Sequence, residues 1–118
     1  MKISELSRLT GASARSIRYY EEMELIMPGR TQAGYRVYKK EHIKIITEIM
    51  WLLEAGLSLK NIKYIVPCTL QKTKILMCED LQNLFSEEIV NIDEKISNLR
   101  KGRSLLVKTL KNSILVTD

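Results

Sequence analysis

A stretch without proline, from Glu79 to Asn112, constrains this chain most. Its apolar residues recur at spacings that alternate between four and three, which is the repeat of a helix with one apolar seam. The seam comprises Phe85, Ile89, Ile92, Ile96, Leu99, Leu106 and Leu110. Arg103 takes the seam position between Leu99 and Leu106, so the far end is expected to be weaker. A helix of this length spans about 50 Å. We expect most of the seam to need a partner rather than to pack on its own small domain.

The composition indicates a mainly helical protein, because two Pro and five Gly are too few for a sandwich with many turns. The longest apolar runs, such as residues 49–53, are far shorter than the roughly 20 residues that cross a bilayer. No signal-peptide core stands at the N-terminus. We therefore expect a cytoplasmic protein with no membrane partner, in which Cys68 and Cys78 are free thiols.

The net charge of +5 is placed unevenly along the chain. Residues 1–66 carry eleven Lys and Arg against seven Glu, whereas residues 67–118 carry eight against seven Asp and Glu. The first half is the more basic one, which suits a polyanionic partner such as nucleic acid. Many ordinary proteins are also mildly basic, so the charge alone does not identify the partner.

Two short helices are predicted at the start of the chain. The apolar spacing predicts one helix up to Thr10, with Ser4 as its cap and Gly11 as its stop. Ser13 offers the N-cap of a second helix over residues 14–23. Two short helices joined by a tight turn that contains Gly form a helix-turn-helix, whose second helix lies in the major groove of DNA.

The second of these helices carries a basic face. Arg15 and Ser16 lie near its N-terminus, where side chains reach base edges and the helix dipole favours phosphate. Arg18 and Tyr20 are placed to hold the DNA backbone, although Tyr20 can also face inward with Ile17. The same pattern fits an ordinary solvated cationic face, because Arg at positions i and i+3 is common on surfaces.

A short β-hairpin is predicted after the second helix. Residues 27–31 start a turn, residues 32–34 supply another, and residues 35–38 alternate as a strand does. The hairpin carries cationic and aromatic side chains, namely Arg30, Tyr35, Arg36, Tyr38, Lys39 and Lys40. Directly after a helix-turn-helix, such a hairpin is a wing that touches the phosphates flanking the groove. The alternative is that the tyrosines only pack across the strands.

Two further helices complete the predicted N-terminal domain. Residues 40–54 have the spacing of a helix that Gly56 ends, and Ser58 caps a fourth helix that Pro67 breaks. The predicted organisation is a winged helix-turn-helix DNA-binding domain over residues 1–66, a linker over 67–78, a dimerisation helix over 79–112 and a short tail over 113–118.

Several of these residues, taken in order, resemble the MerR-type transcriptional regulators. The resemblance rests on Ile3-Ser4-Glu5-Leu6, the Thr10-Gly11 turn, Arg18-Tyr19-Tyr20-Glu21, Pro28 with Arg30, Gly34-Tyr35-Arg36-Val37-Tyr38, and Gly56-Leu57-Ser58-Leu59. It implies a mainly α fold in which DNA is contacted by Ser13, Arg15, Ser16, Arg18, Tyr19, Tyr20, Arg30, Tyr35, Arg36 and Tyr38. One departure is Glu24, which stands where the family usually has Gly, so the turn after the second helix is expected to differ.

The resemblance also implies the partners. The long helix is expected to form an antiparallel coiled coil with a second copy, so that the homodimer presents two N-terminal domains to a pseudo-palindromic double-stranded promoter. Relatives of this type bend and untwist the promoter so that RNA polymerase can use it. Bending a site costs on the order of 1 to 6 kcal/mol, which contacts can offset.

The signal is expected at the junction with the long helix, because the tail after residue 112 has no Cys or His. Cys68 and Cys78 stand ten positions apart, and Cys78 falls at the start of the long helix, where metal-sensing relatives hold a ligand. We interpret the pair as a candidate thiol switch. The alternatives are a soft-metal site that uses both thiols, and two small, partly buried apolar residues without a sensing role.

An enzyme is the main rival class, and the sequence does not favour it. The lone His42 has no Ser or Cys partner at a recognisable spacing, and no phosphate-binding Gly loop or cluster of metal ligands is present. We expect His42 to lie on the surface, and we expect no cofactor. A second rival is a DNA-binding accessory factor outside transcription, which would keep the wing.

Overall fold

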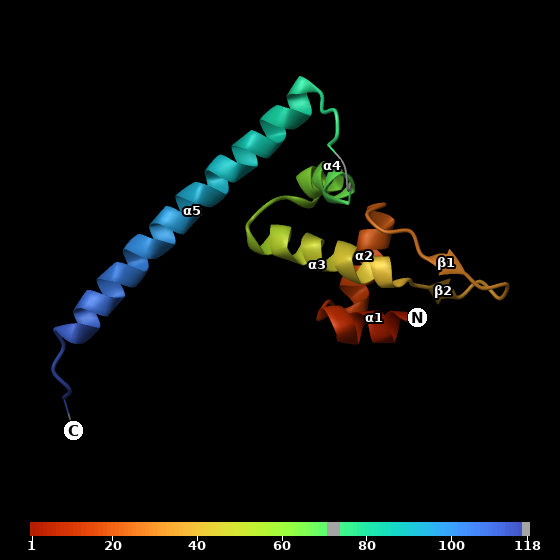
Figure 1. Cartoon of the computed structure of the whole chain (residues 1–118). Coiled ribbons are helices and arrows are strands. Elements are labelled where there is room, and N and C mark those ends of the chain that lie inside the picture. Colours follow the sequence, from red (N-terminus) through yellow and green to blue (C-terminus); the bar gives the residue numbers. More distant parts are fainter. Residues whose placement is uncertain (71–73, 117–118) are drawn as a thin grey trace. The chain divides into compact units, whose positions relative to one another are not determined.

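The computed structural model describes residues 1–70 and 74–116, and within them the chain is mainly helical with one small hairpin (Figure 1), as predicted. It divides into two compact units, Met1–Cys78 and Glu79–Asp118. The first unit holds helices α1 to α4 and both strands. The second unit holds α5. The predicted linker and tail partly fall on residues 71–73 and 117–118, which lie outside the described residues.

The first two helices form the predicted helix-turn-helix. Helix α1 spans Ile3–Thr10 and α2 spans Ala14–Glu22. The prediction that Ser4 caps α1 is wrong, because the N-cap is Lys2, whose side chain makes no capping bond. Gly11 ends α1 as predicted: its φ of 81° is in the left-handed region, and its N–H donates to the carbonyl of Ser7.

Helices α3, Lys40–Glu54, and α4, Leu59–Thr69, complete the first unit. Helix α3 has the predicted bounds. The prediction that Pro67 breaks α4 is wrong, since the helix continues to Thr69. A proline in the last turn removes one backbone donor. The hydroxyl of Thr69 bonds both the carbonyl of Val66, at 2.8 Å, and the carboxylate of Glu48 on α3, which ties this end of α4 to α3.

The core of the first unit lies between these helices, because α1 packs on α2 and α3, and α3 packs on α4. Each helix contributes from one apolar face, and the fully buried side chains are Leu6, Ile17, Tyr38, Ile46, Ile49, Ile62 and Val66. His42 is also buried, so its predicted surface position is wrong. Its Nδ1 accepts a 2.8 Å hydrogen bond from the N–H of Lys39, and its ring packs edge-on against Tyr38. The histidine therefore helps to begin α3.

The predicted wing is a two-stranded antiparallel hairpin. Strand β1 is Gly29–Arg30 and β2 is Arg36–Val37, with Gly29 opposite Val37 and Arg30 opposite Arg36. Just after β2, the backbone of Tyr38 exchanges two hydrogen bonds with Met1, of 2.6 and 2.8 Å. The base of the wing is thus joined to the start of α1.

Helix α5 spans Glu79–Lys111 as one continuous helix (Figure 1, cyan to blue). None of its residues is buried in the single chain. Phe85 and Ile92 are partly exposed, and the remaining predicted seam residues are exposed, namely Ile89, Ile96, Leu99, Leu106 and Leu110. Among the described residues, no helix is long and apolar enough to cross a membrane.

Candidate nucleic-acid interface

The start of α2 is held by two serines. The hydroxyl of Ser13 accepts a 3.0 Å hydrogen bond from the N–H of Ser16 and lies 2.9 Å from the hydroxyl of Ser16. This is the predicted N-cap of α2. Both serines, which were predicted to contact DNA, are therefore engaged in fixing the helix end from which the basic face begins.

The outer face of α2 gathers three predicted DNA-contact residues. Arg15, Arg18 and Tyr19 are exposed, and together with Ser16 and Glu22 they line one shallow hollow. Two cations beside an aromatic ring at the N-terminal part of a helix form a surface suited to phosphates and base edges. The helix is held from behind by Ile17, which is fully buried.

Two predicted DNA-contact tyrosines lie in the core instead of on this face. Tyr20 is 6% exposed and Tyr38 is 2% exposed. Burial raises the pKa of both side chains, and a hydrogen bond with Ser16 partly offsets the rise for Tyr20. The hydroxyl of Tyr38 has no hydrogen-bond partner among the described residues. In this structure both tyrosines act through packing.

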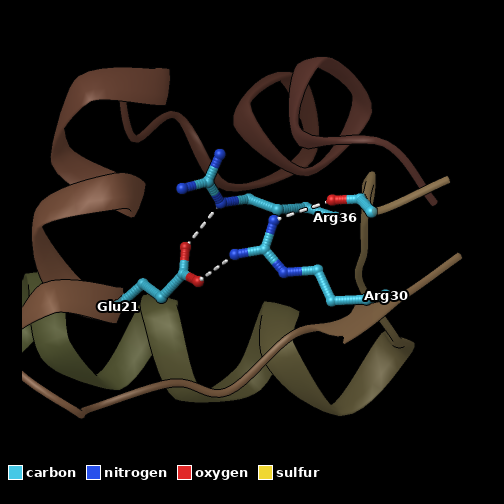
Figure 2. A network of polar contacts seen from close by, with 4 residues as sticks. Glu21, Arg30 and Arg36 are labelled. Atoms are coloured by element: carbon cyan, nitrogen blue, oxygen red, sulfur yellow. Dashed lines mark hydrogen bonds and ion pairs between the residues drawn. The ribbon is translucent and has the colours of Figure 1, made fainter.

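Glu21 joins α2 to the wing (Figure 2). One carboxylate oxygen accepts a 2.6 Å hydrogen bond from Nε of Arg36 on β2, and the other accepts a 3.0 Å hydrogen bond from Nη2 of Arg30 on β1. Nη1 of Arg30 also donates to the carbonyl of Gly34 in the wing turn, at 3.1 Å. We call Glu21, Arg30 and Arg36 the Glu21 clasp.

The clasp places the two arginines differently. Arg30 uses both of its terminal nitrogens within the protein, so it braces the wing against α2. Among the described residues Arg36 bonds through Nε alone, and Figure 2 shows its two terminal nitrogens pointing away from Glu21. The hydrogen bond and charge of Glu21 raise the pKa of Arg36, so this guanidinium stays charged at any physiological pH. It can bond a phosphate while the clasp is intact.

Sequence reasoning missed the role of Glu21. The signal that could have found it is a short acidic run, Glu21, Glu22 and Glu24, that begins one helical turn after Arg18 and precedes the basic wing. Its partners are nine and fifteen residues away in sequence. Spacing along α2 alone could not have identified them.

Glu24 forms the turn that was expected to differ. It has a φ of 61°, in the left-handed region that a residue with a side chain rarely adopts. Its carboxylate lies 3.4 Å from Nζ of Lys63 on α4. The chain thus makes a turn suited to Gly with a glutamate, and an ion pair ties that glutamate to α4.

The remaining predicted site residues are Tyr35 on the wing tip, Cys68 in α4 and Cys78 directly before α5 in the sequence. Tyr35 is exposed at the wing turn. Cys68, in the last turn of α4, is partly exposed and its Sγ lies 3.5 Å from the carbonyl of Tyr64, while Cys78 is exposed just before α5. Among the described residues no three His, Cys, Asp or Glu side chains are grouped to hold a metal ion.

The model of the MerR HTH family of regulatory proteins matches residues 1–67, which include α1, α2, both strands and α3. The chain belongs to the MerR family. The matched residues contain the whole Glu21 clasp and the outer face of α2. Membership of this family confirms two predictions: the chain is a DNA-binding transcription regulator, and it has the predicted fold.

Relatives of the MerR family cover most of the chain. A protein of Haemophilus influenzae named a probable heavy metal-dependent transcriptional regulator is 32% identical over 86% of this chain and 78% of its own length. A MerR family protein from Listeria monocytogenes has a similar structure, with a TM-score of 0.76 and 25% identity over 95% of this chain and 84% of that one.

A third relative was solved with DNA. The structure of HiNmlR, a MerR family regulator lacking the sensor domain, bound to promoter DNA, superposes with a TM-score of 0.72 and 25% identity. The match covers 94% of this chain and 83% of that one. The similarity thus extends past the winged domain into α5.

Proposed function

We propose that this MerR family protein is a homodimeric transcription regulator that binds promoter DNA through the outer face of α2 and the wing. The Glu21 clasp is the observation that carries the proposal, because it fixes a charged wing arginine beside the helix that enters the groove. The similar HiNmlR, a MerR family regulator bound to promoter DNA, supports promoter DNA as the partner.

The proposed contacts divide by their position. Arg15, Arg18, Tyr19, Tyr35 and Arg36 are exposed or have donors directed outward, so they are proposed to contact DNA directly. The other predicted contact residues position these five: Ser13 and Ser16 cap α2, Arg30 braces the wing, and Tyr20 and Tyr38 pack beneath the surface. Phosphate contacts set the register of a protein on the duplex, whereas base contacts specify sequence.

The seam of α5 supports the homodimer. Leu99, Leu106 and Leu110 are 73%, 71% and 75% exposed in the single chain. Each fully buried Leu is worth about 1.5 to 3 kcal/mol, so leaving such a seam in water is unfavourable. We propose that the α5 of a second copy covers it. A dimer then presents two wings and two α2 helices to a two-fold symmetric site.

We further propose that the dimer distorts the promoter so that RNA polymerase can use it. A dimer that carries two α2 helices prefers one spacing between the two half-sites on the DNA. Where the promoter does not match that spacing, the contacts must offset a bending cost of about 1 to 6 kcal/mol. A small change at the junction with α5 can then alter transcription.

For the signal, we propose a thiol switch. Cys78 is exposed and Cys68 partly exposed, and they flank the segment between α4 and α5. Their oxidation to a disulfide would pass two electrons and two protons to an oxidant such as a peroxide. A soft metal held by the thiols is the second candidate, favoured by the relative named a probable heavy metal-dependent regulator.

Transcription from the promoter beside the gene, reconstituted with polymerase, tests the proposal. The wild type should change the transcript level, and Arg18→Gln with Arg36→Gln should abolish the effect. Cys78→Ser should abolish the response to peroxide or to a thiophilic metal. An unchanged effect in the arginine variant would contradict the DNA-binding assignment. A retained response in Cys78→Ser would exclude the thiol switch and leave the DNA-binding assignment standing.

A further inference from the structure

The charged residues of α5 are sorted by sign along the helix. Residues 79–94 carry six acidic residues and no Lys or Arg, whereas residues 95–111 carry six basic residues and no Asp or Glu. The acidic set is Glu79, Asp80, Glu87, Glu88, Asp93 and Glu94. The basic set is Lys95, Arg100, Lys101, Arg103, Lys108 and Lys111.

Two explanations within one chain do not account for this sorting. Acidic residues at the start of a helix and basic residues at its end complement its dipole, but that effect fades beyond the first and last turns. It reaches Glu79 and Lys111 but not the middle of α5. Ion pairs along the helix need opposite charges three or four residues apart. No acidic residue of α5 stands at that spacing from a basic one, whereas Arg100 and Arg103 are a like-charged pair at i and i+3.

A second copy of α5 does account for it. In a parallel pair, the acidic half of one helix would lie against the acidic half of the other, and the two basic halves would also lie together. Both contacts would be repulsive. In an antiparallel pair, each acidic half lies on a basic half, and both contacts are attractive. We propose that the sorted charges of α5 select the antiparallel orientation of the dimer and centre its register. The inference rests on the homodimer proposed above, and it names what fixes the geometry of that dimer.

The central contact can be named. Asp93 and Arg100 line one surface hollow with Ile96, Ser97, Lys101 and Ser104, so they share a side of α5 with the middle of the seam. Asp93 precedes Ile96 by as many residues as Arg100 follows Ser97. A two-fold axis at this point brings Asp93 of each copy to Arg100 of the other, so the contact occurs twice. Glu94 carries the same charge as Asp93 one residue further on, where the helix turns it about 100° away.

A charge exchange in the full chain tests the inference. Asp93→Arg replaces the two central Asp–Arg contacts of the dimer by Arg–Arg contacts, and Arg100→Asp replaces them by Asp–Asp contacts. Each is expected to raise the dissociation constant of the dimer about tenfold, as two attractive contacts become repulsive. The double variant should restore the wild-type value. Glu94→Arg is the matched control and should change the dissociation constant less than about twofold. Sedimentation measures the constants, and circular dichroism confirms that α5 is retained.

Cross-linking tests the orientation. With Cys68→Ser as background, the two Cys78 thiols would be adjacent in a parallel dimer but about 50 Å apart in an antiparallel one. Oxidation should therefore leave this variant unlinked, while adding Ser113→Cys should produce a linked dimer. Salt is a further check, because at 1 M the screening length falls from about 10 to 3 Å and the differences among the charge variants should shrink.

The outcomes separate the two proposals. A wild type that stays monomeric at all concentrations overturns the homodimer and the inference with it. A dimer that links through Cys78 alone, or whose dissociation constant is the same for Asp93→Arg and Glu94→Arg, overturns the inference and leaves the homodimer standing.

Discussion

The carboxylate of Glu21 accepts a 2.6 Å hydrogen bond from Nε of Arg36, so α2 and the wing meet at this carboxylate. The same carboxylate also holds Arg30 at 3.0 Å. An acidic side chain on a DNA-binding surface works against affinity for phosphate unless it positions stronger contacts. In this protein it turns Arg36 so that its two terminal nitrogens point away from Glu21 (Figure 2).

Glu21→Gln is expected to weaken binding to a two-fold DNA site about fivefold to tenfold, although it removes a negative charge. The reason is that the wing loses its fixed position relative to α2, and charge-assisted bonds of this kind are worth roughly 1.5 to 3 kcal/mol at most. Fluorescence anisotropy with a labelled duplex measures the affinity. Glu22→Gln is the matched control: Glu22 is exposed on the same helix, and its loss should leave binding equal or slightly tighter. Equal behaviour of the two variants would exclude a role for the clasp.

Arg30 and Arg36 are expected to differ in the salt dependence of binding. Removing one phosphate interaction lowers the slope of log affinity against log salt by about 1. Arg36→Gln should lower the slope by about that amount, because its terminal nitrogens are available to phosphate. Arg30→Gln should weaken binding with a smaller change in slope, since its donors are used by Glu21 and Gly34. An equal decrease of slope in the two variants would mean that both arginines bind phosphate.

The stability of the protein is expected to fall at high pH because of its buried tyrosines. Burial raises the pKa of Tyr38 and Tyr20, so the unfolded chain releases these protons first, near pH 10. The contribution of these two tyrosines to the free energy of unfolding should therefore be constant below about pH 10 and should decline above it. Tyr38→Phe should make the decline shallower. It should also raise stability by about 1 kcal/mol at pH 7, because the buried hydroxyl has no partner among the described residues. Urea unfolding at several pH values measures the stability at pH 7 and its decline above about pH 10. A decline in Tyr38→Phe equal to that of the wild type would contradict the burial argument.

Glu24→Gly is expected to stabilise the protein by about 1 kcal/mol, because Gly adopts the left-handed region without the cost that a side chain adds there. The loss of the ion pair with Lys63 should offset only a few tenths of this gain, since both groups are exposed. Glu24→Ala keeps the strain and removes the same ion pair, so it should be slightly destabilising. If Gly and Ala give the same unfolding free energy, the backbone at Glu24 is not strained.

The sequence predicted those parts of the fold that local patterns determine. The bounds of α3, the stop at Gly11 and the cap at Ser13 each follow from a few neighbouring residues. Predictions failed where a contact from elsewhere decided the outcome. His42 is buried because it bonds the backbone of Lys39 and packs on Tyr38, and α4 continues past Pro67 to Thr69, which binds Glu48.

The candidate site was predictable in its components but not in its connections. A helix with Arg15 and Arg18 outward, followed by a basic hairpin, is visible in the spacing of residues. The burial of Tyr38 was not, because alternation in a short strand does not tell which face meets the core, whereas the spacing along α2 left both an inward and an outward position open for Tyr20. Nor was the Glu21 clasp, since it depends on how the hairpin folds back onto α2.

We propose that α2 and the wing together bind DNA, and one measurement tests this most directly. A two-fold site is selected by the protein from a random duplex library, and its affinity is then measured at several salt concentrations for the wild type and for Arg18→Gln with Arg36→Gln. The double variant is expected to bind at least about a hundredfold more weakly, with a salt slope lower by about 2. An affinity and a slope equal to those of the wild type would contradict the account.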